Sequence, residues 1–325
     1  MQIPMLHGAC LRADAVHLFG RHRVSSALAT GELLSPWRGV VVDARRAAEP
    51  LTIITAARLA IGTYGLVTGP SAAYLHGLTA LDPLPVHIVV PYETRKASRP
   101  GIVVHNGTFL ADDQEERLGL PVLGLDRVLA DLACTIEPWA ALAVLDEALA
   151  RAADLDPARL RRSIRELIGV RSDPRGTRIG TRLIDLATGR AESPQESWLL
   201  WRVVDLGFPV PEANLPVLDI DGRELYRLDL GWEELRIALE YNGYAAHAGR
   251  AEVDEARRRD IEQRGWIVVD ADREDRRSAS RLEKELDEAF MARGVDVRGR
   301  TPRALRPRRH REPRSRQGLR RDPPC

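Results

Sequence analysis

Hydrophobic positions in the first 65 residues change from helical to extended spacing. The pattern predicts short helices over Leu11–Phe19 and Val24–Thr30, then Gly31, then an extended segment over Trp37–Val42. Helix, turn, helix and extended hairpin is the order of a small winged helix-turn-helix, so we predict one in residues 1–65. A structural subdomain that does not contact DNA gives the same pattern, and both interpretations stay open at this point.

The next segment, residues 66–185, alternates helical and extended stretches and is predicted as an α/β region. Helical spacing covers Leu51–Tyr64 just before this segment and, within it, Ser71–His76, Arg127–Ala133, Pro138–Ala153 and Pro157–Leu167. Extended segments cover Val86–Val90 and Ile102–His105. Residues 169–189 are rich in turn formers, so we expect a domain boundary or a mobile connection there.

The third region, residues 190–294, begins with a clear helix-start signal. Ser193 is suited to the N-cap, Pro194 to the first helical position, and Glu196 completes a capping box. Tyr226–Trp232 and Arg236–Gly243 then have the pattern of two strands in a hairpin. A further strand over 265–269 and a closing helix over Leu282–Phe290 complete the predicted region.

Two carboxylates lie within the predicted hairpin. Alternation of side chains brings Asp229 and Glu240 to one surface, with Asn242 two residues farther along. Acidic residues inside apolar strands are uncommon unless they are paired or bind a cation. Mg²⁺ held by such oxygen ligands can activate a water and stabilise charge on a scissile phosphate. In the alternative interpretation, both carboxylates face solvent on a half-exposed hairpin.

Arginines cluster on the helix expected after the hairpin. Arg257, Arg258 and Arg259 are our candidates for nucleic-acid binding, because guanidinium groups suit phosphate oxygens. Acidic residues are interleaved with them, and the pairs Asp254–Arg258 and Glu255–Arg259 have i, i+4 spacing. A solvated helix that pairs its own charges is therefore the favoured interpretation.

The overall composition says little about partners unless the positions of the charges along the chain are considered. The chain has 325 residues, 44% hydrophobic and 29% charged, with 48 Lys and Arg against 47 Asp and Glu. This is an ordinary globular composition for about two domains. Residues 299–325 nevertheless hold ten arginines, two acidic residues and five prolines, so this end carries +8 and the remainder about −7. We predict a basic disordered tail over 295–325 that can neutralise phosphates.

Three widely separated cysteines form no pair at metal or disulfide spacing, which fits a reducing cytosol. His76, His87 and His105 have no acidic or cysteine partner at ligand spacing, so they do not predict a metal site. The first ten residues lack a signal-peptide pattern, and no apolar run of about 18 residues occurs. We therefore expect a cytoplasmic protein without a membrane partner.

The order of motifs in the third region resembles a known family. The motifs are Ser193–Glu196, Arg227–Asp229, Ala238–Gly243, His247, Arg257–Asp260 and Gly265–Val269. They look like the endonuclease-like domain of many actinobacterial proteins, which is similar to very-short-patch-repair endonucleases and belongs to the PD-(D/E)xK fold. The resemblance implies a mixed sheet flanked by helices and metal-dependent cleavage of phosphodiester bonds.

The same resemblance implies roles for individual residues. Asp229 and Glu240 match the metal-binding acids, and Glu196 matches the acid of the first helix. His247 matches a histidine that can relay a proton, with a hinge or surface histidine as the alternative. Asn242 departs from the family, where a lysine or an acidic residue is usual, although its amide oxygen can still coordinate Mg²⁺ or Mn²⁺. Catalysis is therefore less firmly implied than the fold.

The first two regions resemble a second family. Ser71–Leu78, Val86–Pro91, Gly119–Val122 and Arg127–Leu132 look like the abortive-infection antitoxin-like region that is often fused to such nuclease domains. This resemblance implies nucleic-acid binding or regulation, and a toxin or phage-defence partner. It does not locate a site.

Two hypotheses follow for this α/β (α+β) chain. In the leading one, Glu196, Asp229, Glu240 and His247 support Mg²⁺- or Mn²⁺-dependent hydrolysis of DNA by a cytoplasmic endonuclease. In the alternative, favoured by Asn242, the nuclease fold is a binding platform in a catalytically weak or inactive DNA-binding regulator of antitoxin type. Neither hypothesis specifies an oligomeric state.

Overall fold

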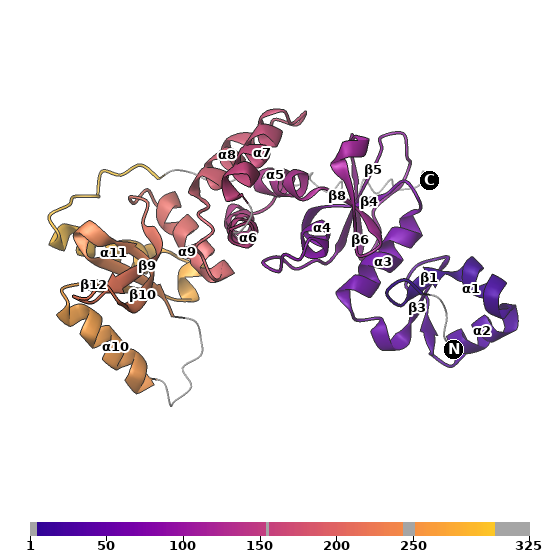
Figure 1. Cartoon of the computed structure of the whole chain (residues 1–325), viewed down its shortest axis with the longest axis horizontal. Helices are drawn as coiled ribbons and strands as arrows, with labels where there is room; N and C mark the ends of the chain where they lie inside the picture. Colours follow the sequence, from indigo (N-terminus) through magenta and orange to yellow (C-terminus); the bar gives the residue numbers. More distant parts are fainter. Residues whose placement is uncertain (1–4, 154–155, 243–250, 303–325) are drawn as a thin grey trace, which may run out of the picture.

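The chain has the mixed α/β fold class that its sequence predicts. The computed structural model describes residues 5–153, 156–242 and 251–302. Three sheets follow one another along an elongated molecule, with the N-terminal helices at one end and the third sheet at the other (Figure 1). Within these ranges, no helix has both the length and the apolar surface needed to cross a bilayer.

The first sheet contains three antiparallel strands in the order β1-β3-β2. In chain order its elements are β1 (Ala9–Leu11), α1 (Arg12–Phe19), α2 (Arg21–Ala29), β2 (Leu33–Leu34) and β3 (Val40–Asp43). The second helix starts three residues before the predicted Val24. Gly20, with φ +81°, ends α1 in a conformation that favours glycine, and α2 begins at the next residue.

Helix α3 (Pro50–Ile61) joins the first sheet to the rest of the molecule. Ala56 on this helix lies in the small core of the first sheet, whereas Ile54 and Ile61 lie in the large central core. One helix therefore contributes to both cores, and the predicted division at residue 65 follows a helix that the two units share.

The middle sheet has five strands in the order β6-β5-β4-β8-β7. Its strands are β4 (Leu66–Val67), β5 (Val86–Val90), β6 (Ile102–Asn106), β7 (Gln114–Arg117) and β8 (Leu120–Leu123). Its helices are α4 (Gly69–Leu75), α5 (Leu125–Thr135), α6 (Pro138–Arg151), α7 (Pro157–Gly169) and α8 (Thr177–Leu186). The sequence pattern predicts β5 and β6 but not the other strands, which have only two to four residues and show too few alternations.

The third sheet has four strands in the order β12-β11-β10-β9, antiparallel except for the parallel β11–β12 pair. The elements of this unit are α9 (Pro194–Asp205), β9 (Glu212–Leu218), β10 (Glu224–Trp232), β11 (Ile237–Tyr241), α10 (Ala251–Gln263), β12 (Ile267–Ala271) and α11 (Ser280–Ala292). The predicted N-cap is present: Ser193 Oγ accepts from the amide of Glu196 at 3.3 Å and donates to its carboxylate at 2.7 Å. The Glu196 carboxylate accepts from the backbone amide of Glu192 at 2.8 Å and not from that of Ser193, so the reciprocal bond of the capping box is made one residue earlier.

Residues 295–302 are packed against this third unit, which differs from the predicted tail. Val297 is buried, and the Arg300 guanidinium lies 4.0 Å from the centre of the Phe208 ring. Arg300 also forms ion pairs with Asp287 at 2.5 Å and Glu283 at 2.6 Å. The tail prediction is therefore wrong for residues 295–302, because a charged residue can be buried when acidic partners neutralise it. Residues 303–325 lie outside the described ranges.

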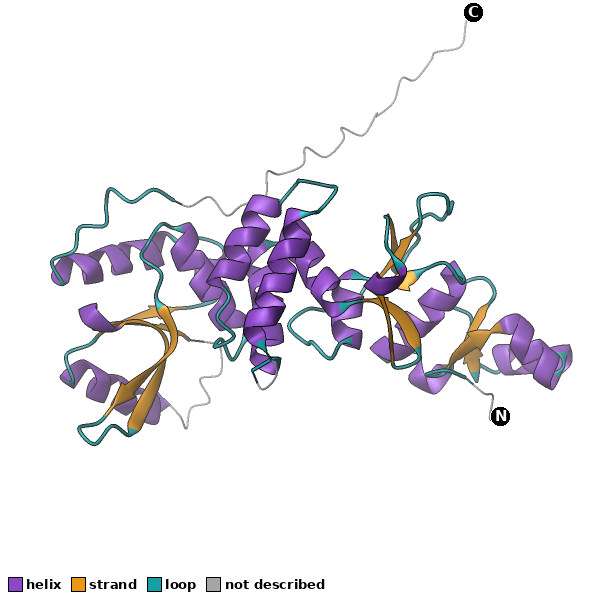
Figure 2. Cartoon of the chain, turned by 45° about the horizontal axis from the view of Figure 1, so that its top comes forward, coloured by secondary structure: helices purple, strands orange, loops and turns teal. Residues whose placement is uncertain are grey.

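The middle and third units share one hydrophobic core. Buried side chains form a single cluster that runs from α3 through α5 and α6 to α9 and α11. Helix α6 packs along α9, so the helices in the centre of the molecule join the two sheets (Figure 2). The predicted boundary at 169–189 contains α8, whose Leu183 and Ile184 lie in this same core, so it does not divide two separate cores.

Candidate functional site

Helix α2 presents basic and polar side chains to solvent at its first turn. Arg21, His22 and Arg23 are exposed, whereas Val24 and Ala27 on the opposite side are buried. The first turn contains no acidic residue. Arg21 and Arg23 have no ion-pair partner among the described residues. The positive end of the helix dipole and two unpaired guanidinium groups thus occupy the same turn.

A second basic element lies at the hairpin between β2 and β3. Arg38 is exposed at its tip, and the amide of Arg12 donates to the carbonyl of Gly39 at 2.9 Å. This bond places the start of α1 beside the hairpin. Neither Arg12 nor Arg38 is ion-paired within the ranges that the structure describes. Four arginines therefore lie on the α1–α2–hairpin surface without intramolecular neutralisation.

The acidic residues of the third unit come together as the hairpin pattern predicts. The antiparallel register that pairs Leu230 with Leu239 sets Asp229 opposite Glu240. The pKa of Asp229 is raised to about 6, chiefly by burial and to a smaller extent by the nearby charges of Glu240 and Glu196. The amide of Tyr241 donates to Asp229 Oδ2 at 2.8 Å, and this hydrogen bond lowers the pKa of Asp229, which partly offsets the rise. The three carboxylates thus share one electrostatic environment.

Glu240 is neutralised by an arginine of α10. Arg257 Nη2 donates to Glu240 Oε1 at 2.8 Å, and Nη1 donates to Oε2 at 2.5 Å, so both carboxylate oxygens are occupied. Arg257 Nη2 also donates to the carbonyl of Arg227 at 2.9 Å, which fixes the guanidinium across β10 and β11. A bidentate pair of this kind is strong and directional.

The other predicted site residues are distributed around this pair. Glu196 accepts hydrogen bonds from the Ser193 hydroxyl, the Glu192 amide and the Asn214 side-chain amide, the last two at 2.8 Å. Asn242 is exposed at the end of β11, where its backbone amide donates to β12. His247 lies outside the described residues.

The arrangement does not fit a divalent cation. Both oxygens of Glu240 accept from Arg257, and both oxygens of Glu196 accept from protein donors. Across residues 5–153, 156–242 and 251–302, no three His, Cys, Asp or Glu side chains are grouped to hold a metal. A cation would have to displace a guanidinium before Asp229 and Glu240 became its ligands. Magnesium binding and cleavage therefore remain predictions from the sequence.

The predicted nucleic-acid arginines on α10 are engaged within the chain. Arg258 pairs with Asp270 on β12 and with Glu262, the latter at 3.0 Å, while Arg259 pairs with Glu255 at 3.5 Å. The i, i+4 pairs Glu255–Arg259 and Arg258–Glu262 match the self-paired interpretation. Arg258 pairs with Glu262 and Asp270 and not with the predicted Asp254. With Arg257 on Glu240, each of the three guanidinium groups faces a carboxylate.

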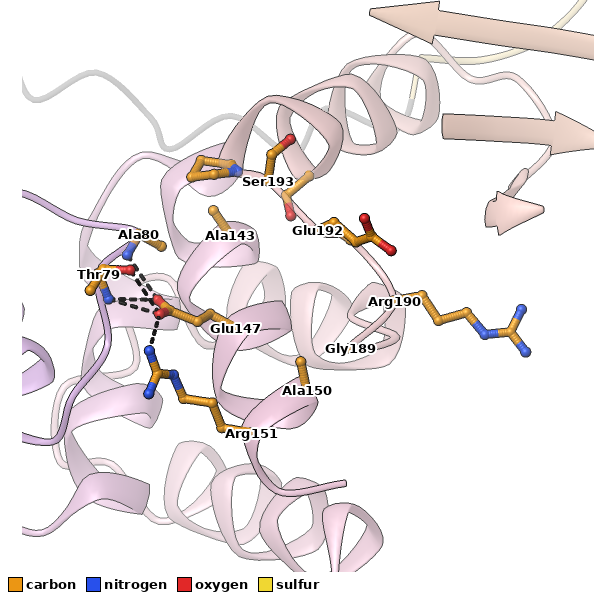
Figure 3. Close-up of a pocket in the computed structure, with 13 residues that line it drawn as sticks. Thr79, Ala80, Ala143, Glu147, Ala150, Arg151, Gly189, Arg190, Glu192 and Ser193 are labelled. Carbon is orange, nitrogen blue, oxygen red and sulfur yellow. Dashed lines mark hydrogen bonds and ion pairs between the residues drawn. The ribbon is translucent and has the colours of Figure 1, made fainter. Parts of the chain in front are cut away.

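A cavity of about 690 Å³ lies where α6 meets the turn before α9 (Figure 3). Inside it, Glu147 accepts hydrogen bonds from the amides of Thr79 and Ala80, from the Thr79 hydroxyl, and from Arg151 at 3.1 Å. Arg190 points away from these groups, and its guanidinium pairs with Glu212 (Figure 3). Glu147 therefore fastens the loop after α4 to α6, and we give it a structural role.

The arginines of α1, α2 and the hairpin are not among the residues predicted from the sequence. A usable signal was present, since Arg21 and Arg23 stand directly after Gly20 in a segment without acidic neighbours. Their lack of partners, by contrast, becomes visible only in three dimensions.

Comparison with known proteins gives two results. Residues 65–180 match the AbiEi antitoxin C-terminal domain family. Two uncharacterized proteins, from two strains of Mycobacterium tuberculosis, are each 31% identical to this chain over an alignment of 288 positions, which covers 84% of this chain and 99% of the relative. The predicted antitoxin-like region is thus confirmed for residues 65–180, and the endonuclease resemblance of residues 190–294 stays a prediction.

Proposed function

Because the chain belongs to the family of the two Mycobacterium tuberculosis proteins and matches the AbiEi antitoxin C-terminal domain over residues 65–180, we propose that it is a DNA-binding regulator of antitoxin type. This was the alternative hypothesis from the sequence. Arg257 neutralises the carboxylate of Glu240, and this favours the regulator hypothesis over the endonuclease hypothesis.

One observation carries the proposal: four exposed arginines on the first unit lack acidic partners among the described residues. The unit has two helices followed by a hairpin on a sheet ordered β1-β3-β2, which is the arrangement expected of a winged helix-turn-helix. Arg21 and Arg23 occupy the N-terminal turn of the second helix, which is the part that contacts base edges in such modules. Arg12 and Arg38 would then bind the phosphates on either side.

The test is DNA binding by the full chain, measured by fluorescence anisotropy over a range of salt concentrations. The duplex is first selected from a random library. The double variant Arg21→Gln/Arg23→Gln is expected to bind at least tenfold more weakly than the wild type, because two guanidinium contacts are lost. In Arg12→Gln and Arg38→Gln, by contrast, the slope of log affinity against log salt should fall by about 0.9 for each phosphate contact that is lost.

A matched control separates this surface from general positive charge. Arg159 and Arg162 are exposed on α7, and replacing both by Gln removes the same total charge. This control is expected to bind DNA like the wild type. Equal losses in the two double variants, or no binding of any duplex by the wild type, would refute the proposal.

The antitoxin family match also supports a protein toxin as a second partner. The full chain, affinity-tagged and expressed in its native host, is expected to co-purify with one protein at a fixed ratio. Expression of that protein alone should arrest growth, and co-expression of this chain should relieve the arrest. Recovery of the chain without such a protein would remove the toxin from the proposal and leave the DNA-binding part intact.

A further inference from the structure

A cavity of about 620 Å³ lies between the middle sheet and the helices that cover it. Its walls come from β5 and β6 on one side, and from α5 and the turn between α7 and α8 on the other. The functional groups that face it include Arg127, Arg171, His87, His105 and Tyr92. None of these residues belongs to the DNA surface or to the acidic cluster described above.

Arg171 is buried in this wall with an incomplete set of partners. Its side chain is 10% exposed, and Nη1 forms an ion pair with Asp131 Oδ1. Nε is buried without an acceptor, and Nη2 has no hydrogen bond to a described residue. A guanidinium that has lost its water is costly unless acceptors replace that water. Among the described residues, Nε is therefore the one nitrogen of Arg171 that is buried without an acceptor.

Arg127 brings a second positive charge to the same carboxylate. Its Nε donates to Asp131 Oδ2 at 3.1 Å, so one aspartate lies between two guanidinium groups. Burial lowers the pKa of Arg171, and the charge of Arg127 lowers it further. Asp113 also pairs with Arg127 at 3.8 Å, and the charge of Asp173, which lines the cavity, raises the pKa of Arg171. An anion entering beside Arg171 would supply the acceptor that its buried Nε lacks. Paired guanidinium forks are well matched to phosphate oxygens.

Two histidine rings line another part of the cavity. His87 Nδ1 and His105 Nε2 are 3.0 Å apart, and the rings stack with centroids separated by 5.1 Å. Burial lowers the pKa of both rings, to about 4 for His87, so both are neutral near pH 7. Gly69, with φ +57°, lies under His87, where an added Cβ would be 3.2 Å from Nδ1. The flat, uncharged rings are suited to contact a planar group.

We propose that this cavity binds a small phosphorylated ligand of the nucleotide class, with its phosphate at Arg127 and Arg171 and its base toward His87, His105 and Tyr92. The volume is far larger than a phosphate ion requires and falls in the range of small-molecule sites. Tyr92, 64% exposed at the rim, adds an aromatic surface on which a base can stack. The proposal does not depend on the DNA-binding function.

Calorimetric titration of the full chain with AMP and, separately, with inorganic phosphate tests the proposal. AMP is expected to bind saturably and at least tenfold more tightly than phosphate. Arg127→Gln and Arg171→Lys should each weaken AMP binding at least tenfold, because each removes one guanidinium fork. Circular dichroism and thermal melting of both variants establish that they are folded. AMP binding no tighter than phosphate binding would overturn the proposal.

Arg151→Gln is the matched control. Arg151 pairs with Glu147 at i, i+4 spacing, as Arg127 pairs with Asp131, but it lies at the other cavity. The Arg151→Gln variant should bind AMP with the affinity of the wild type. If Arg151→Gln and Arg127→Gln weaken AMP binding equally, binding is general charge attraction and the site is refuted. Loss of AMP binding in Arg21→Gln/Arg23→Gln with retention in Arg127→Gln would place the nucleotide on the DNA surface and also refute it.

Discussion

The hydroxyl of Ser197 in α9 donates a 2.8 Å hydrogen bond to the buried carboxylate of Asp146 in α6. The other oxygen of Asp146 accepts from the backbone amides of Thr188 and Gly189 at 2.8 and 2.9 Å. Burial raises the pKa of Asp146, and these three donors act in the opposite direction. One side chain thus connects the middle unit, the turn before α9 and the third unit.

Ser197→Ala should lower the free energy of unfolding by about 1 to 3 kcal/mol, because it leaves a buried carboxylate oxygen without its donor. Urea denaturation at pH 7 measures the change. Ser163→Ala on α7, where the structure gives the hydroxyl no hydrogen bond, is the control and should be close to neutral. Equal stability of the two variants would contradict a connecting role for Asp146.

Asp229 should make stability depend on pH in a defined direction. Its folded-state pKa of about 6 lies above the ordinary 3.8, so the ionised carboxylate destabilises the fold above pH 6 and the penalty disappears below 3.8. Asp229→Asn removes the charge and keeps an acceptor for Tyr241. We expect it to stabilise the protein at pH 8 by about 1 to 2 kcal/mol after solvent screening, and by less at pH 4.

The measurement is urea denaturation of wild type and variant at several pH values. Asp221→Asn serves as the control, since Asp221 is exposed at the β9–β10 turn. The change in the free energy of unfolding caused by Asp221→Asn should be the same at pH 4 and pH 8. If Asp229→Asn increases the free energy of unfolding by the same amount at every pH in this range, the carboxylate of Asp229 is not perturbed by burial.

Calorimetric titration of the wild type with Mg²⁺ or Mn²⁺ is expected to give no saturable binding at millimolar concentration, because Arg257 occupies both oxygens of Glu240. Arg257→Gln releases Glu240 beside Asp229 and should increase metal binding. Arg259→Gln removes an exposed arginine of the same helix and should leave metal binding unchanged. Saturable binding by the wild type that Glu240→Ala abolishes would restore the endonuclease hypothesis.

Arg300 and Arg298 are expected to differ in their contribution to stability, although each is paired with acidic residues. Arg300→Gln should cost about 3 kcal/mol, since its side chain is 10% exposed and its loss leaves Asp287 and Glu283 uncompensated. Arg298→Gln should cost less than about 1 kcal/mol, because its pair with Asp296 is exposed. Thermal melting compares them, and similar melting temperatures would show that residues 295–302 do not support the third unit.

Local spacing determined several features without any tertiary information. The N-cap bond between Ser193 and Glu196 joins residues three positions apart, so its geometry follows from the helix start itself. The hairpin register likewise set Asp229 opposite Glu240, because side chains alternate along strands joined by a short turn. The antitoxin-like middle region also showed recognisable motifs, which the family match over residues 65–180 confirmed.

Only the tertiary structure decided which partners those residues obtain. Glu240 and Arg257 are separated by 17 positions, and their pairing depends on how α10 packs across the sheet. Arg258 pairs with Glu262 at i, i+4 spacing, as the helix allows, but its second bond to Asp270 on β12 depends on how α10 packs on the sheet. Periodicity records which face a residue lies on, but the pairing of distant charges depends on how elements pack. The sequence by itself therefore determined the acidic cluster and the α/β class, while the packing of α10 decided that this cluster meets an arginine.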